Sequence, residues 1–122
     1  MTKVFLVARY LLGVFVFVFG LNKFIGFMEF PAFQGFAAQY MAVIGGSYIL
    51  QSMGVIYILS AILLVTGRAV GLATILLAPI AYNAFMFHLT LDPANIAGAL
   101  VFVVLIVVVM IGNKEKYLGL LR

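Results

Sequence analysis

Residues 69–91 form a long apolar stretch in which an amide, Asn83, and an imidazole, His88, are the most polar side chains. A helix needs about 20 mainly apolar residues to cross the hydrocarbon core of a bilayer, and this stretch is long enough. An amide or an imidazole is costly to expose to lipid, so both side chains are expected to face protein or a wet cavity. The stretch therefore predicts a membrane-spanning helix with a polar side turned toward the protein.

The composition extends this prediction to the whole chain. Of the 122 residues, 67% are hydrophobic and 8% are charged, whereas soluble domains carry roughly 25% charged residues. A water-soluble core of this size could not bury so much apolar surface, so lipid must be the solvent for most of the chain. We expect one all-α integral membrane domain over residues 1–122.

Four segments have the length and apolarity of transmembrane helices, at about residues 4–24, 47–66, 69–91 and 94–111. Val and Phe alternate over residues 14–19 as in a β-strand, but a lone strand cannot span lipid. Asp92 and Pro93 suit the N-cap and the first position of the last helix. The predicted fold is a four-transmembrane-helix bundle.

The basic residues predict an orientation. With four spans both termini lie on one side of the membrane, and of the seven basic residues only Lys23 lies on the other side. The shared side carries Lys3, Arg9, Arg68, Lys114, Lys116 and Arg122. Because positive charge is retained on the cytoplasmic side, we expect a multi-pass protein with both termini cytoplasmic. Topology also explains the formal charge of +4, so nucleic acid is not an expected partner.

Residues 32–44 predict an extra short amphipathic helix between the first two spans. Apolar residues recur there at helical spacing and form a stripe of Phe33, Phe36, Ala37, Tyr40, Met41 and Ile44. Gln34 and Gln39 lie off this stripe. The segment is too short to cross the bilayer, so we expect it to lie in the outer interface or to cap the bundle.

The predicted topology gathers the uncommon polar side chains in the outer leaflet, between the first three spans. These candidate ligand-binding residues are Asn83, His88, Asp92, Lys23, Asn22, Gln51 and Tyr48. Each also has a purely structural interpretation. His88 and Asp92 can pair at a helix end, Asn83 can bond a neighbouring helix, and Lys23 can reach out to the interface. On a straight helix, Asn83 and His88 point roughly 140° apart, so a shared ligand would have to wrap the helix or use a kink at Pro79.

Several chemistries are excluded by what the sequence lacks. The absence of cysteine removes thiol catalysis and Cys-held metals, and one histidine with three carboxylates falls short of a zinc site. No acidic residue lies at the centre of a predicted span, which disfavours a proton-coupled transporter. We find no complete catalytic constellation and expect neither a metal nor a cofactor held within the chain. Any enzymatic role would be associated with an oxidoreductase.

Three stretches resemble the DoxX family of small bacterial four-helix membrane proteins: RYLLGVFVFVFGLNKFIGFM at 9–28, TGR at 66–68 and LLAPIAYNAFMFHLTLDPA at 76–94. The most specific pattern runs from Pro79 through Asn83 and His88 to Asp92. The resemblance covers nearly the whole chain and implies a four-helix bundle in the bacterial cytoplasmic (inner) membrane. Many relatives carry an acidic or amide residue in the middle of the second span, where this chain has Tyr57 among aliphatic residues.

The resemblance also implies a place beside membrane redox enzymes, because some relatives resemble subunits of quinone-linked oxidoreductases that act on sulfur compounds. We expect a subunit or accessory of a membrane redox system, with a membrane or peripheral oxidoreductase as partner, that binds a quinone or another lipophilic ligand in an outer-leaflet pocket. Asn83 and His88 would hydrogen-bond that ligand, with Asp92 orienting His88. The alternatives are a non-catalytic scaffold or assembly factor and, less favoured, a small transporter. An oligomer of this chain is also compatible with the sequence.

Overall fold

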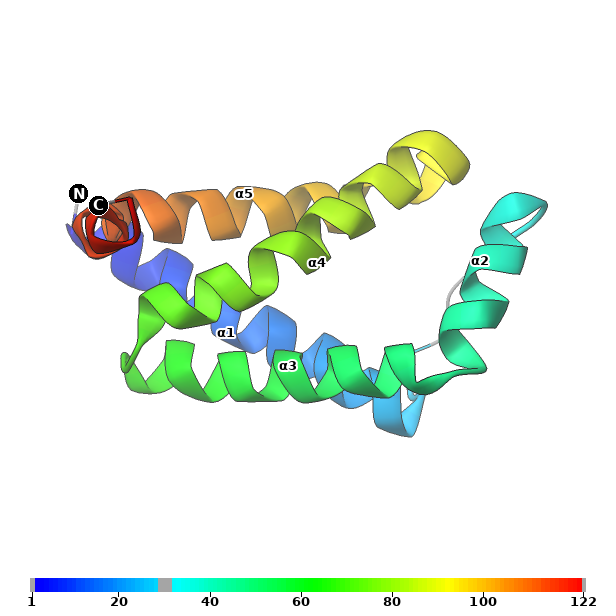
Figure 1. Ribbon diagram of the computed structural model, residues 1–122, viewed down its shortest axis with the longest axis horizontal. Coiled ribbons are helices and arrows are strands. Elements are labelled where there is room, and N and C mark those ends of the chain that lie inside the picture. The colour runs from blue at the N-terminus through cyan, green and yellow to red at the C-terminus, as the bar shows by residue number, and fades with distance from the viewer. Residues whose placement is uncertain (1, 29–31, 122) are drawn as a thin grey trace.

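The computed structural model describes residues 2–28 and 32–121, and every regular element within them is helical. The four longest helices run along the long axis of the molecule, as Figure 1 shows, and are α1 (Thr2–Ile25), α3 (Tyr48–Thr66), α4 (Val70–Leu91) and α5 (Ala97–Gly112). Helix α1 packs against α3 and α5, and α4 packs against the same two helices. Helix α4 begins beside α3 and ends beside α5 (Figure 1).

Three of these helices, α1, α3 and α4, are long and apolar enough to cross a membrane. Helix α5 has 16 residues and reaches the length of a span only together with the 3-10 helix η2 (Lys114–Leu120), which is bent away from it by 82°. The prediction of an all-helical protein with helices of membrane-spanning length is therefore confirmed. The number of spans and their orientation stay predictions.

The turn between α4 and α5 differs from the predicted helix start. Asp92 and Pro93 do open a helical turn, but it is a short 3-10 helix, η1 (Pro93–Asn95), and α5 begins only at Ala97. The Asp92 carboxylate makes no capping bond to the backbone. Its two oxygens instead accept hydrogen bonds from the side-chain amide of Asn95, each at 3.1 Å.

Where the sequence predicts a short amphipathic helix over residues 32–44, the structure has the helix α2 (Phe36–Gly45), which begins later than expected. Its amphipathic role at a membrane interface stays a prediction. Gly35 comes directly before the helix and has a φ of 62°. This left-handed conformation favours glycine and prevents the helix from extending further toward the N-terminus. Of the predicted apolar stripe, Ala37 and Ile44 are buried, but Phe36 is 74% exposed and belongs to the outer surface. Helix α2 stands across one end of the bundle instead of along it (Figure 1).

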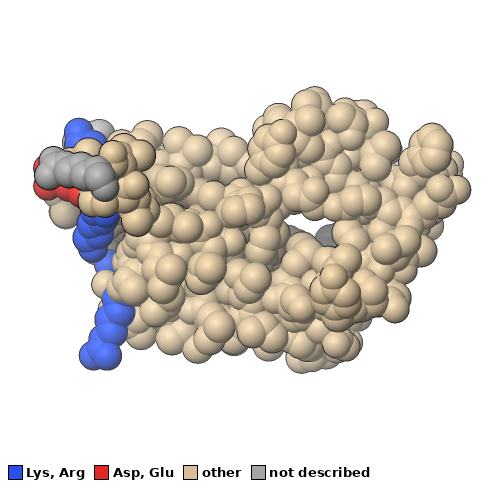
Figure 2. Space-filling view, in the orientation of Figure 1, with Lys and Arg blue, Asp and Glu red and all other residues tan. Residues whose placement is uncertain are grey.

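The two ends of the bundle differ in charge and in packing. Both termini lie at one end, called here the terminal end, where the basic side chains visible in Figure 2 also gather. The fully buried side chains of Leu12, Leu64 and Leu77 belong to the continuous core of the bundle. At the opposite, distal end, α4 diverges from α3, and α2 contacts both of these helices (Figure 1). The candidate site lies at this distal end.

Candidate functional site

A cavity of about 500 Å³ occupies the distal end of the bundle. All five α-helices and η1 contribute side chains to its wall, and Phe33 contributes from the segment before α2. In Figure 2 the surface has an opening bordered by α4, α3 and α2, so the cavity is open to the outside there. Its volume falls within the range of roughly 300–1,000 Å³ that is typical of small-molecule sites.

Aromatic rings form the inner wall of the cavity, where α1, α3 and α5 meet. The Phe15 ring lies 4.6 Å from that of Phe19 and 5.3 Å from that of Phe102, centroid to centroid. Tyr57 of α3 meets Phe102 edge to face at 5.6 Å. Rings at these separations attract one another beyond simple burial of their area. The result is a firm apolar wall that offers both ring faces and ring edges to a ligand.

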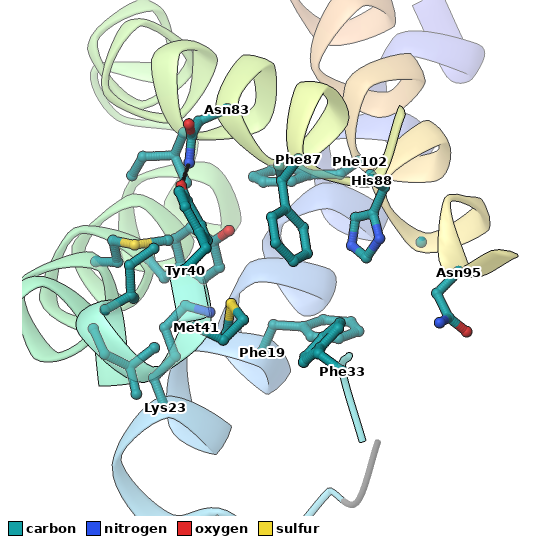
Figure 3. A pocket seen from close by; sticks show the side chains of 18 of the residues that line it. Phe19, Lys23, Phe33, Tyr40, Met41, Asn83, Phe87, His88, Asn95 and Phe102 are labelled. Carbon is teal, nitrogen blue, oxygen red and sulfur yellow. Dashed lines mark hydrogen bonds between the residues drawn. The ribbon is translucent and has the colours of Figure 1, made fainter. Parts of the chain in front are cut away.

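Phe87 of α4 stands at the centre of a second aromatic group. Its ring stacks on Tyr40 of α2 at 4.9 Å and meets Phe33 edge to face at 5.5 Å. On its other side it meets the His88 imidazole at 5.0 Å. Through these contacts Phe87 joins α2 and the segment before it to α4, and so closes the outer side of the cavity (Figure 3).

Asn83 lines the cavity and has a hydrogen-bond partner on a neighbouring helix. Its side-chain N–H donates to the hydroxyl of Tyr40 at 2.5 Å, which links α4 to α2. Among the alternatives for this residue, the bond to a neighbouring helix is therefore present. Because this bond connects α4 to α2, Asn83 also holds the Tyr40 ring in place beside the cavity.

His88 also lines the cavity, on the opposite side of Phe87 from Asn83 (Figure 3). Its Nδ1 lies 3.3 Å from a carboxylate oxygen of Asp92, but the angles are not those of a hydrogen bond. Asp92 does not line the cavity and is held by Asn95. Asn83 and His88 thus share one cavity although they point in different directions, because the cavity extends around Phe87.

Lys23 sits in the last turn of α1, and its ammonium group points into the cavity instead of out to an interface (Figure 3). The Nζ atom lies 4.8 Å from the centre of the Tyr57 ring, within the range of a cation–π contact. Within the described residues, the one ion pair joins His88 to Asp92, so Lys23 has no carboxylate partner. The cavity therefore contains a cation that no anion of the described chain balances.

Besides Asp92, three more of the candidate residues lie outside the cavity, namely Tyr48, Gln51 and Asn22. Tyr48 is 76% exposed, Gln51 is exposed, and neither lines the wall. The face of α3 that does line it carries Leu50, Met53 and Tyr57 at helical spacing. Asn22 accepts a hydrogen bond from the Met28 backbone N–H at 2.7 Å and so holds the turn after α1.

Sequence reasoning did not select four residues that shape the site: Tyr40, Phe87, Asn95 and Tyr57. Tyr40 was placed on the apolar stripe, and Tyr57 was noted only as a departure from the family pattern. Asn95 follows Asp92 by one helical turn, which is the spacing at which its amide can reach that carboxylate. Phe87 belongs to the family-like pattern from Pro79 to Asp92, but the sequence analysis assigns it no role of its own among the 12 phenylalanines.

No family model, no curated protein and no solved structure matches this chain. The resemblance to the DoxX family stays a prediction, and the site has to be interpreted from its own residues.

The side chains of the wall suit binding. Aromatic rings offer stacking surfaces, while the Lys23 ammonium, the Asn83 amide and the His88 imidazole offer donors to an oxygen atom of a ligand. Over residues 2–28 and 32–121, no three histidine or carboxylate side chains come together as a metal site would require. The arrangement can hold an amphiphilic molecule with its apolar part on the phenylalanines and its polar part near Lys23 or His88.

Proposed function

We propose that this chain binds a quinone or a related lipophilic molecule in its distal cavity, as a subunit or accessory of a membrane redox system. One observation carries the proposal: an aromatic cavity of about 500 Å³ contains Lys23, Asn83 and His88 within a helix bundle of membrane character. Most of the wall is apolar, with a few polar groups at defined places, which is the usual composition of a small-molecule site.

The chemistry of a quinone matches this wall. Its planar ring can stack on a phenylalanine, and its isoprenoid or alkyl tail can leave through the opening between α2 and α4. Its carbonyl oxygens can accept hydrogen bonds from Lys23 or His88.

The proposal includes a topology of four spans with both termini in the cytoplasm of a bacterium. The alignment of α5 with the three longer helices and the basic side chains at the terminal end support it (Figures 1 and 2). Cysteines placed at Thr2 and Asn113 should resist an impermeant thiol reagent in intact cells and react after permeabilisation. Labelling of either position in intact cells contradicts this topology. Glu29, the natural external control position, lies outside the described residues.

A filled cavity tests the binding function. Gly98 lines the cavity, and a Cβ built there meets no atom within 4 Å, so Gly98→Phe adds a ring at the cavity wall with no clash of its Cβ. Gly119, in η2 at the terminal end, has equally open surroundings and gives the matched control Gly119→Phe. Lipophilic molecules extracted from each purified protein are identified by mass spectrometry.

We expect the wild type and Gly119→Phe to retain a quinone or similar lipophile in about stoichiometric amount and Gly98→Phe to lose it. Equal amounts in all three proteins would show that the molecule is not held in the cavity. No retained molecule in any of them, combined with co-purification of membrane proteins, would favour the alternative of a non-catalytic scaffold or assembly factor. A relation to the DoxX family is part of the proposal and would be consistent with either outcome.

A further inference from the structure

The balance of charge in the distal cavity selects among lipophilic ligands. Lys23 is the one formal charge among the described residues that line it, apart from the titratable His88. Asp92 does not line the cavity, and its carboxylate accepts hydrogen bonds from Asn95 and lies 3.3 Å from Nδ1 of His88. The described wall therefore has a net positive charge and no anion within it.

A cation in such a place is costly without a partner. Ion pairs and charge-assisted hydrogen bonds are stronger inside a protein than in water, because the effective dielectric constant is lower. The contact of the Lys23 ammonium with the Tyr57 ring recovers part of the lost hydration. An ionised oxygen would recover more, because it offers full charge complementarity and a hydrogen-bond acceptor.

The position of Lys23 also defines where such an oxygen would sit relative to the apolar wall. The ammonium group enters from the last turn of α1, and Phe19 and Phe15 lie one and two turns earlier on the same helix and line the same cavity. A molecule with its charged end at Lys23 would therefore place its apolar part along these rings.

We propose that the ligand of the distal cavity is an anionic amphiphile, in which a carboxylate or an equivalent ionised oxygen pairs with Lys23 and an apolar body lies on the phenylalanine wall. This inference rests on the proposed binding function and adds the charge of the ligand's head group. Two classes of molecule have this combination of an ionised oxygen and an apolar body: a fatty acid, and a lipophilic quinone that carries an ionised hydroxyl group.

Matched probes separate charge from shape. Hexadecanoate and hexadecanol differ in the head group, and an alkylated 2-hydroxy-1,4-naphthoquinone and its methyl ether differ in the ionised oxygen. Each probe is titrated into purified protein in uncharged detergent at neutral pH, and the dissociation constant is measured for wild type, Lys23→Gln and Lys23→Arg. Lys3→Gln removes a lysine from the first turn of α1, at the terminal end, and serves as the control for net charge.

We expect the anion of at least one pair to bind about tenfold more tightly than its neutral partner, since a charge-assisted bond exceeds a neutral one by about that factor. The preference should vanish in Lys23→Gln and persist in Lys23→Arg and Lys3→Gln. The pair that shows it identifies the source.

Equal binding of anion and neutral analogue to the wild type, with loss of both in Gly98→Phe, would overturn this inference and leave the binding function intact. A preference that survives in Lys23→Gln would also overturn it. If no probe binds the wild type, both the inference and the proposed binding function fail.

Discussion

Helices α1 and α3 pack closely at Gly20, and substitution by alanine there tests the helix packing. A Cβ added at Gly20 would lie 2.8 Å from the Cβ of Tyr57 and 3.1 Å from Cδ1 of Ile58. The Tyr57 Cβ is attached directly to the α3 backbone, so no change of rotamer moves it away. The helices themselves would have to separate until this contact reaches at least 3.4 Å.

The expected cost follows from two opposing effects. Inserting a methyl group into a packed contact costs about 1–3 kcal/mol, whereas replacing a helical glycine by alanine recovers up to about 1 kcal/mol of backbone entropy and propensity. The net result for Gly20→Ala is a destabilisation of about 1–2 kcal/mol, which in a domain of this size lowers the melting temperature by several degrees.

Gly54→Ala provides the control, because its nominal contact is even shorter. A Cβ there would lie 2.6 Å from Cε2 of Phe24. This atom is at the far end of a side chain that is 51% exposed, so the ring can turn aside at little cost. We expect Gly54→Ala to be within about 0.5 kcal/mol of the wild type.

The free energy of unfolding is measured for both variants by titrating the purified protein with a denaturing detergent in mixed micelles. If Gly54→Ala were the more destabilising of the two, the distance alone and not the rigidity of the opposing atom would govern the cost. The reasoning about helix packing would then be wrong.

Three further contacts give predictions. Asn83→Leu and Tyr40→Phe should each lower the free energy of unfolding, and a double-mutant cycle should give a coupling energy of about 1 kcal/mol between the two residues. If the two losses of stability simply add, the direct bond is contradicted. Tyr117→Phe removes the hydroxyl that bonds Thr74 and so links η2 to α4, and amide hydrogen exchange in η2 should become faster. Unchanged exchange rates would show that this bond does not hold η2 in place. Gly67→Ala should destabilise by about 1–2 kcal/mol in the same unfolding assay, because Gly67 has a φ of 74°; wild-type stability would contradict the strain.

The helices could be predicted because the bilayer leaves few choices. Long apolar segments must satisfy their own backbone hydrogen bonds, so their existence and approximate ends follow from the sequence. The predicted segments 47–66 and 69–91 each begin one residue before the observed α3 and α4 and end at the same residue. The start of α2 was missed because it depends on the left-handed conformation of Gly35, which the apolar periodicity does not report.

The site was predictable in depth along the bundle but not in direction around each helix. Lys23, Asn83 and His88 were assigned to one layer, and they do line one cavity. Tyr48 and Gln51 are predicted in the same layer, but both are exposed and do not line the cavity. The rotation of α3 about its own axis decides which of its residues line the cavity and which are exposed. This rotation is set by the residues of α3 that pack on α1. That choice depends on tertiary contacts that hydropathy does not encode.

The contact at Gly20 also accounts for the unusual direction of Lys23. These residues are three apart in α1 and therefore lie on the same side of the helix. Because Gly20 lacks a side chain, this side approaches α3 closely at Tyr57, and the next turn carries the Lys23 ammonium over the ring of the same tyrosine. The packing of α1 on α3 thus holds the cation in the cavity. Gly20→Ala, which forces the helices apart at Tyr57, should therefore weaken anion binding as well as stability, although it changes no side chain of the cavity wall.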